Sequence, residues 1–270
     1  MTAPPEIIDC WINVPVGSPD ASAAYLFPGL KERWERLVSP AELVAEMDAA
    51  GISRAVLVSG WGPEDSISYV RQALKDYPDR FAASHIVDPR GGMRTIDLIR
   101  HLVRDEGYRM IRMLAFDTQV PYGDPRCYPV YAKCAELGVP IGLNVGIPGP
   151  QVPGACQHPM LIDAICHFFP ELTVIMAHGG EPWEALCVKL MLKWPNLHYM
   201  TSAFAPRHIP DAIMRYLNTR GADRILWASD HPILTFQRCL QEIAELHFRD
   251  EATRSKFLGL NAKRLLFPKD

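Results

Sequence analysis

Eight short apolar runs, separated by longer amphipathic segments, constrain the fold of this chain most strongly. The runs are rich in Val, Ile and Leu and are bounded by Gly, Pro or Asp, which is typical of buried parallel strands. They cover residues 7–13, 55–60, 81–87, 110–116, 139–145, 172–178, 197–202 and 225–229. Because the runs alternate with helical patterns, we expect one parallel sheet with right-handed crossovers.

The segments between the runs carry helix signals. Ser39 is a predicted N-cap, Pro40 stands at the first helical position, and Gly51 fits a helix stop. Similar patterns predict helices over residues 63–77, 93–106, 129–137, 159–168, 181–194, 210–220, 232–248 and 251–266. Eight such repeats in 270 residues predict a closed (β/α)8 TIM barrel of the α/β class, as a single domain over residues 1–270.

Composition argues against several functional classes. Hydrophobic residues make up 48% of the chain and the net charge is -3, so we expect a globular core and no nucleic-acid partner. No glycine-rich nucleotide-binding stretch follows any predicted strand. The seven cysteines form no CxxC pair, and the first residues do not resemble a signal peptide. We therefore expect a cytoplasmic protein with reduced thiols and no membrane association.

Polar residues stand at the ends of several predicted strands, where a barrel builds its active site. An alternating pattern places Asp9, Trp11 and Asn13 on one face of the first strand and turns Cys10 away. The later strands end in or carry His85, Arg112, Asn144, His178 and Asp230. Because burying one polar group without a partner is costly, several at the same rim indicate a functional site.

Two longer segments are predicted loop insertions at this same rim. Residues 14–39 contain prolines and aromatic residues, and residues 146–157 read GIPGPQVPGACQ. Each follows a predicted strand, so each is expected at the carboxyl face of the barrel. We interpret both as a lid or pocket wall, with a simple surface loop as the alternative.

Several motifs carry a resemblance to a known family. They are AHGGEPW at residues 177–183, SDHP at residues 229–232 and LNAKRLLF at residues 260–267, together with IIDCWINV at residues 7–14. With these motifs the chain resembles the amidohydrolase-related family. That family includes aminocarboxymuconate-semialdehyde decarboxylase, resorcylate-type decarboxylases and pyrone-dicarboxylate lactonase. The resemblance runs nearly from end to end and implies the same barrel.

The resemblance also implies where a metal would bind, and this chain departs from it. The family usually holds its metal with two histidines on the first strand, one on the fifth and an aspartate on the eighth. These positions carry Trp11, Asn13, Asn144 and Asp230 here. Trp cannot ligate a metal and Asn is a weak ligand, whereas a zinc site needs about three or four N, S or carboxylate donors. We therefore expect no metal and no other cofactor, with bound Zn or Mn as the alternative.

The remaining residues suggest acid–base chemistry. The resemblance implies a general acid–base role for His178, which suits a side chain whose pKa lies near neutrality. Asp230 would orient His178 or activate water itself, and the amides of Asn13 and Asn144 would donate to a developing oxyanion. Each residue also has a structural alternative. His178 would be a buried histidine whose hydrogen bonds go to the backbone, and Asp230 would cap the next helix. Asn13 and Asn144 would be polar residues without a role in the chemistry.

Three further residues are candidates for substrate binding. Arg112 would hold a substrate carboxylate through two hydrogen bonds, unless it pairs with Asp9. Trp11 would fill the volume of the missing metal or stack on a planar substrate. His85 is a further candidate, unless it packs lower in the barrel.

These expectations lead to three functional hypotheses. The first is a metal-independent hydrolase of a small lactone or related carbonyl compound that works through His178 and Asp230. The second is a non-oxidative decarboxylase of an aromatic or unsaturated carboxylic acid, in which His178 or Asp230 protonates carbon. The third is a non-catalytic binding barrel. The expected partner is a small-molecule substrate, with a homodimer as a further possibility.

Overall fold

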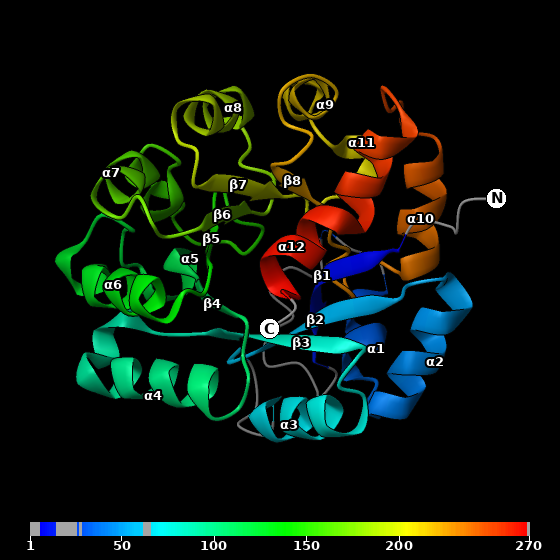
Figure 1. Ribbon diagram of the computed structural model, residues 1–270, viewed down its shortest axis with the longest axis horizontal. Coiled ribbons are helices and arrows are strands. Elements are labelled where there is room, and N and C mark those ends of the chain that lie inside the picture. Colours follow the sequence, from blue (N-terminus) through cyan, green and yellow to red (C-terminus); the bar gives the residue numbers. More distant parts are fainter. Residues whose placement is uncertain (1–5, 15–25, 27–28, 62–65, 269–270) are drawn as a thin grey trace.

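The computed structural model describes residues 6–14, 26, 29–61 and 66–268. Within them, eight parallel strands pair in sequence order (Figure 1). The sheet closes on itself, because the Cys10 amide donates to the Trp227 carbonyl at 3.2 Å and Ile12 forms a parallel bridge with His231. The prediction of a (β/α)8 TIM barrel is therefore confirmed.

The strands form the centre of the barrel and the helices surround them (Figure 1). The strands are β1 (Ile8–Asn13), β2 (Arg54–Ser59), β3 (Phe81–Ile86), β4 (Met110–Met113), β5 (Ile141–Asn144), β6 (Val174–Ala177), β7 (Leu197–Met200) and β8 (Ile225–Leu226). The α-helices are α1 (Leu30–Glu35), α2 (Pro40–Ala50), α3 (Ser66–Asp76), α4 (Met93–Arg104), α5 (Ala115–Thr118), α6 (Tyr128–Leu137), α7 (Leu161–Phe168), α8 (Glu184–Lys193), α9 (Asp211–Leu217), α10 (Phe236–Ala244), α11 (Glu251–Ser255) and α12 (Asn261–Leu266). Short 3-10 turns are η2 (Pro89–Gly91), η3 (Pro125–Cys127), η4 (Ala155–Gln157) and η5 (Pro206–His208).

Helix α2 shows how the local sequence sets its own ends. The Glu42 amide donates to the Ser39 hydroxyl oxygen at 3.3 Å, and the Ser39 amide donates to the Glu42 carboxylate at 2.8 Å. This reciprocal pair is a capping box, and Pro40 lacks the N–H that would otherwise need a partner. Gly51 ends the helix with a φ of 78°, a conformation that glycine adopts without steric cost. The predicted start and stop of this helix are both confirmed.

The chain ends in a helical segment that closes the amino-terminal end of the barrel. A π-helical turn, η6 (Lys256–Leu260), separates α11 from α12, where the sequence predicted one helix. Gly259 in this turn lies against the Glu6 carbonyl, so a side chain there would clash with the backbone before β1. Ala262 and Leu266 of α12 then pack into the apolar cluster inside the barrel. The close approach of these two backbones explains the interruption.

Strand β1 departs from simple alternation. Its pairing with β2 shifts register between Asp9 and Ile12, so β1 contains one extra residue there. As a result Cys10 and Trp11 both belong to the cluster inside the barrel, whereas Asp9 binds Ser229 at the end of β8. The prediction that Asp9 and Trp11 share a face, with Cys10 turned away, is therefore wrong.

The two predicted insertions differ in how much of them the structure describes. Residues 15–25 and 27–28 of the first lie outside the described residues, while its last part forms α1. The second, residues 146–157, ends in η4 and supplies Ile147 and Pro148 to the wall of a cavity. No helix among the described residues has both the length and the apolar character to span a membrane.

Candidate active site

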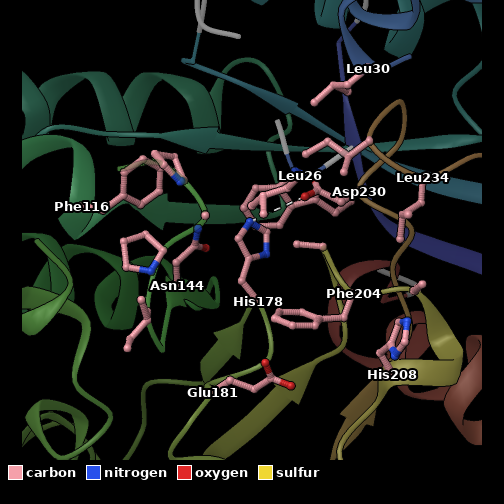
Figure 2. A pocket seen from close by; sticks show the side chains of 18 of the residues that line it. Leu26, Leu30, Phe116, Asn144, His178, Glu181, Phe204, His208, Asp230 and Leu234 are labelled. Carbon is pink, nitrogen blue, oxygen red and sulfur yellow. Dashed lines mark ion pairs between the residues drawn. The ribbon is translucent and has the colours of Figure 1, made fainter. Parts of the chain in front are cut away.

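A cavity of about 1160 Å³ opens at the carboxyl ends of the strands. Polar side chains from the ends of β5, β6 and β8 line its inner part, and Trp11 of β1 lies beside them. Figure 2 shows His178 in the middle of this group, with Asn144 on one side of it and Asp230 on the other. The barrel therefore brings together residues that are up to about two hundred positions apart in the chain, as expected for a site built at this face.

His178 follows β6 directly and has a left-handed backbone, with a φ of 64°. Its Nδ1 lies 2.7 Å from the Ser202 hydroxyl oxygen, which also accepts a hydrogen bond from the His178 amide at 3.3 Å. Because that oxygen already accepts one N–H, its own proton is available for Nδ1. This arrangement favours the tautomer with its proton on Nε2, the atom that faces Asp230.

Asp230 follows β8 and also has a left-handed backbone, with a φ of 61°. One carboxylate oxygen lies 3.8 Å from His178 Nε2, and the other accepts a hydrogen bond from the Asn13 amide at 2.8 Å. Burial raises the pKa of Asp230 to about 7, although the Asn13 hydrogen bond and the Arg112 charge oppose the increase. Asp230 can therefore gain or lose a proton near neutral pH.

Burial has the opposite effect on His178, because it disfavours the protonated cation. It lowers the pKa of His178 to about 3, and the nearby Arg112 charge contributes to the decrease. His178 is therefore neutral at physiological pH, and its contact with Asp230 is a polar contact of a neutral ring rather than a salt bridge. Both side chains line the cavity, so a molecule bound there can contact each of them.

Asn13 and Asn144 take different positions, although we expected the same role for both. The Asn13 amide nitrogen donates to Asp230 and to the His231 carbonyl at 3.1 Å, and its oxygen accepts from Trp11 Nε1 at 2.9 Å. Both of its N–H groups are thus engaged, so the structure corrects its expected role from oxyanion donor to support of Asp230. The Asn144 side chain lines the cavity and has no hydrogen-bond partner among the described residues. Its amide is available to a ligand.

Trp11 closes the floor of the cavity. Its ring lies 4.5 Å from the His178 ring, centroid to centroid, and below it the Arg112 guanidinium carbon lies 3.7 Å from the Trp11 ring centroid. Such stacking of a buried cation on an indole is attractive. The ring therefore fixes His178 from one side and separates Arg112 from the cavity.

Arg112 does not reach the place where we expected it to bind a substrate carboxylate. It is 1% exposed and donates to the Ser84 hydroxyl at 3.0 Å and to the Cys10 carbonyl at 2.9 Å. The alternative pairing with Asp9 is also wrong, because that carboxylate accepts from Ser229 instead. The interior of the barrel, with the indole of Trp11 above it, leaves Arg112 no path to a ligand.

His85 is likewise displaced from the expected site. Its Nδ1 lies 2.8 Å from the Ser59 hydroxyl, which is 3.1 Å from the Tyr108 hydroxyl. Burial lowers the pKa of His85 to about 4. Its neighbour Ser84 contacts Arg112 inside the barrel, so alternation along β3 turns His85 outward. His85 is a structural histidine of the barrel wall and does not line the cavity.

With this geometry in place, comparison with known proteins assigns the family. Residues 8–267 match the family model described as amidohydrolase. The chain belongs to this family. The membership confirms the resemblance inferred from the motifs and identifies the protein as an enzyme, so the hypothesis of a non-catalytic barrel is not retained. Comparison with curated proteins finds no match.

Solved structures of other proteins share the fold at low sequence identity. An uncharacterised TIM-barrel protein from Bordetella bronchiseptica has a TM-score of 0.79 and 23% identity over 96% of this chain and 98% of its own. A 5-carboxyvanillate decarboxylase from Novosphingobium aromaticivorans has a TM-score of 0.73 and 17% identity, over 96% and 95%. A probable 2-pyrone-4,6-dicarboxylic acid hydrolase from Acinetobacter baumannii, with citric acid bound, has a TM-score of 0.71 and 16% identity, over 96% and 98%. Both decarboxylases and hydrolases thus use this barrel.

These relatives overturn one expectation. The decarboxylase from Novosphingobium aromaticivorans is complexed with manganese, which contradicts our prediction that no cofactor is involved. The residues of this chain nevertheless fit the ion poorly. Among the described residues, no group of three or more His, Cys, Asp or Glu side chains could hold a metal ion. Asn13 turns its amide oxygen toward Trp11, which leaves Asp230 as the charged donor. We therefore derive no step through a metal.

Sequence reasoning placed Trp34 in an insertion that it interpreted as a lid or pocket wall, and it missed the other residues that line the outer part of the cavity. One wall is aromatic and another carries basic side chains; these two groups are Trp34, Trp61 and Phe116, and Arg207, His208 and Arg238. Their positions after β2, β4, β7 and β8, or in the first insertion, were the available signal, because such segments meet at the carboxyl face. The sequence does not show which of their side chains point inward.

Proposed function

We propose that this amidohydrolase-family enzyme is a hydrolase that opens a lactone or cleaves a related carbonyl compound, with Asp230 and His178 at the centre of its acid–base site. The observation that supports the proposal best is the meeting of these two groups at the floor of the cavity. His178 Nε2 lies 3.8 Å from an Asp230 carboxylate oxygen, and burial raises the pKa of Asp230 to about 7 and lowers that of His178 to about 3. Titratable pairs whose environments separate their pKa values are typical of acid–base sites.

The geometry suggests how water would be activated. A water molecule beside the ionised Asp230 would lose a proton to the carboxylate while its oxygen bonds to the substrate carbonyl carbon. The carbonyl oxygen then becomes an oxyanion, and the Asn144 amide, which has no protein partner among the described residues, can donate to it. Asn13 holds Asp230 in place through its 2.8 Å hydrogen bond.

The proton balance closes through Asp230. When the tetrahedral intermediate collapses, the C–O bond to the leaving oxygen breaks and that oxygen takes the proton that Asp230 gained from water, which restores the carboxylate. The neutral His178 keeps its Nε2 proton and donates a hydrogen bond to the leaving oxygen while charge develops on it. The Ser202 hydroxyl at 2.7 Å from Nδ1 keeps the ring oriented during the cycle. The net reaction adds one water across one ester bond.

A decarboxylase is the second candidate, because the raised pKa of Asp230 also supports an acid role. Below about pH 7 this carboxyl is protonated, so it could deliver a proton to the carbon that loses CO2. A non-oxidative decarboxylation needs this proton donor, whereas the hydrolysis above needs the ionised form. The two reactions therefore depend on pH in opposite ways.

The test is turnover of two substrate panels, unsaturated six-membered lactones and hydroxybenzoates, between pH 5 and 9. Hydrolysis by the proposed route gives a kcat/KM that rises with pH through an apparent pKa near 7. Decarboxylation gives a kcat/KM that falls over the same range. Each assay is run as purified, with added manganese and after chelation, so that a metal requirement is measured separately from the role of Asp230.

The control variant is Asp79→Asn, which removes an exposed carboxylate from the turn before β3. It should leave both the rate and the pH profile unchanged. Lactone turnover whose pH dependence persists in Asp230→Asn would refute the assignment of the base. Hydroxybenzoate turnover without lactone turnover would replace the hydrolase with the decarboxylase.

A further inference from the structure

The aromatic wall of the cavity lies beyond the residues that handle protons. Trp34 of α1, Trp61 after β2 and Phe116 of α5 come from three separate segments and line the same cavity. The Trp34 and Trp61 rings are 6.0 Å apart at an interplanar angle of 89°, and the Trp61 and Phe116 rings are 6.2 Å apart at 79°. Edge-to-face contacts of this kind hold each ring in one orientation.

Burial shows that the wall is preformed. Trp34 and Phe116 are 7% and 9% exposed, and Trp61 packs against both apolar clusters of the barrel. Leu30 and Leu114 line the cavity as well, so the surface near the rings is apolar. A flat apolar group that enters the cavity would therefore meet fixed ring surfaces and displace water from them.

The size of the cavity indicates a ligand larger than one small ring. Its volume of about 1160 Å³ lies above the roughly 300–1,000 Å³ of pockets that hold drug-sized molecules. A single-ring acid or lactone at His178 would leave much of this volume to water. Figure 2 shows Phe116 well to one side of His178, with His208 on the other side. The reacting group and the aromatic wall thus occupy different parts of the cavity.

We propose that the substrate carries a second ring, or an equally flat apolar group, beyond its reacting carbonyl, and that Trp34, Trp61 and Phe116 hold this second group. The inference rests on the proposed function in one respect, namely which end of the substrate reacts. The binding site for the second ring stands on the geometry of the wall. The substrate class is accordingly a two-ring or aryl-extended lactone or carboxylic compound.

The test measures binding of three probes, benzoate, 2-naphthoate and biphenyl-4-carboxylate, by isothermal titration calorimetry with the full-length protein. The dissociation constant should fall at least tenfold from benzoate to biphenyl-4-carboxylate, because the added ring buries apolar surface against the wall. Trp61→Ala should remove most of this gain and change the affinity for benzoate less than twofold. Equal affinities across the three probes would overturn the proposal.

Two further variants keep the test decisive. Phe116→Leu keeps an apolar side chain but removes a flat ring. It should lower the ratio of the affinities for biphenyl-4-carboxylate and benzoate at least threefold, which provides a test even if Trp61→Ala does not fold. Phe168→Ala removes a phenylalanine of α7 that is 64% exposed and does not line the cavity, and it should bind all three probes as the native protein does. A loss that is the same for benzoate and for the larger probes in the wall variants would also overturn the proposal.

This experiment separates the two proposals. If probe affinity rises with ring number while lactone turnover is independent of Asp230, the second-ring site stands and the proposed function fails. If turnover depends on Asp230 while the three probes bind alike, the function stands and the second-ring site fails.

Discussion

Two sectors of the same barrel carry polar residues at their strand ends, but one of them presents these residues to the cavity. In the sector of β6 to β8, His178 and Asp230 line the cavity floor. In the sector of β3 and β4, His85 lies in the barrel wall and Arg112 lies beneath Trp11. The residue types are similar in the two sectors, so composition alone does not explain the difference.

The backbone explains it. His178, Ala203 and Asp230 follow β6, β7 and β8 and have φ values of 64°, 69° and 61°. A left-handed residue turns the chain sharply at the strand end and is uncommon for residues other than glycine. His85 and Arg112 lie within extended strands, where alternation directs each side chain outward or into the packed interior. At β6 and β8, the left-handed turn after the strand brings His178 and Asp230 to the cavity, whereas Asn144 reaches it from the last position of β5.

The largest effect that this comparison predicts is on activity. Asp230→Asn should lower kcat by about 10²–10⁴-fold, the usual contribution of a general base. His178→Ala should lower kcat by about 10²–10³-fold, because it removes the hydrogen bond that supports proton transfer to the leaving oxygen. Circular dichroism and thermal unfolding should show that both variants remain folded. Native-like turnover in either variant would contradict the proton-transfer assignment.

The matched control for this pair comes from the other sector. His85→Gln replaces a buried histidine that hydrogen-bonds Ser59 but does not line the cavity. Its kcat/KM should stay within about threefold of the native value, because it touches no substrate. A loss as large as that of His178→Ala would remove the distinction between the two sectors.

A second prediction concerns Asp9, which braces the turn of Asp230. The Asp9 carboxylate accepts hydrogen bonds from the Ser229 amide at 3.0 Å and from the Ser229 hydroxyl at 2.5 Å, and burial raises its pKa to about 6. A carboxyl whose pKa is higher in the folded state loses stability as pH rises from about 4 to about 6, because the unfolded chain ionises first. This loss amounts to about 3 kcal/mol and is absent in Asp9→Asn.

The measurement is urea unfolding of the native protein and of Asp9→Asn at pH 4 and pH 7. Relative to the native protein, Asp9→Asn should gain about 2 kcal/mol of unfolding free energy between these two values, because the unfolded carboxyl is already partly ionised at pH 4. Buried histidines affect both proteins equally and cancel in the difference. A difference that does not change with pH would show that Asp9 keeps an ordinary pKa in the folded protein.

The smallest predicted effect is on backbone strain. Ala203 has a φ of 69°, so Ala203→Gly should relieve the steric cost of a left-handed residue while adding some chain entropy to the unfolded state. We expect a net gain of about 0.5 kcal/mol, which corresponds to an increase in Tm of about 1–2 °C. A lower Tm would show that the turn after β7 is held by contacts of the alanine methyl group instead of being strained.

Much of the fold could be predicted because its signals are local. The apolar runs and the Ser39 cap lie within a few residues of the strands and the helix that they specify. Hydrophobic periodicity and capping preferences therefore predict these elements from the sequence. The bulge in β1 could not be predicted, because it depends on how Asp9 binds Ser229, a residue at the other end of the chain. The interruption before α12 depends in the same way on the approach of Gly259 to the Glu6 backbone.

The candidate site was predictable in its centre and not at its edges. His178 and Asp230 stand in motifs and follow strands, so their place at the cavity floor followed from the barrel. Arg112 and His85 also lie on strands, yet alternation gave no way to tell a side chain under Trp11 from one in the cavity. The absence of family metal ligands led to the prediction of no cofactor, which the manganese-bound relative contradicts.

The sequence by itself determined the barrel, the family and the two residues at the centre of the candidate site. These follow from periodicity and from motifs whose residues are neighbours in the chain. The tertiary structure alone decided which polar groups meet the cavity, that Asn13 supports Asp230 while Asn144 stays available, and that three aromatic rings form one wall. The physical reason is that exposure, pKa and hydrogen-bond partners depend on groups brought together from distant segments, and only packing specifies those neighbours.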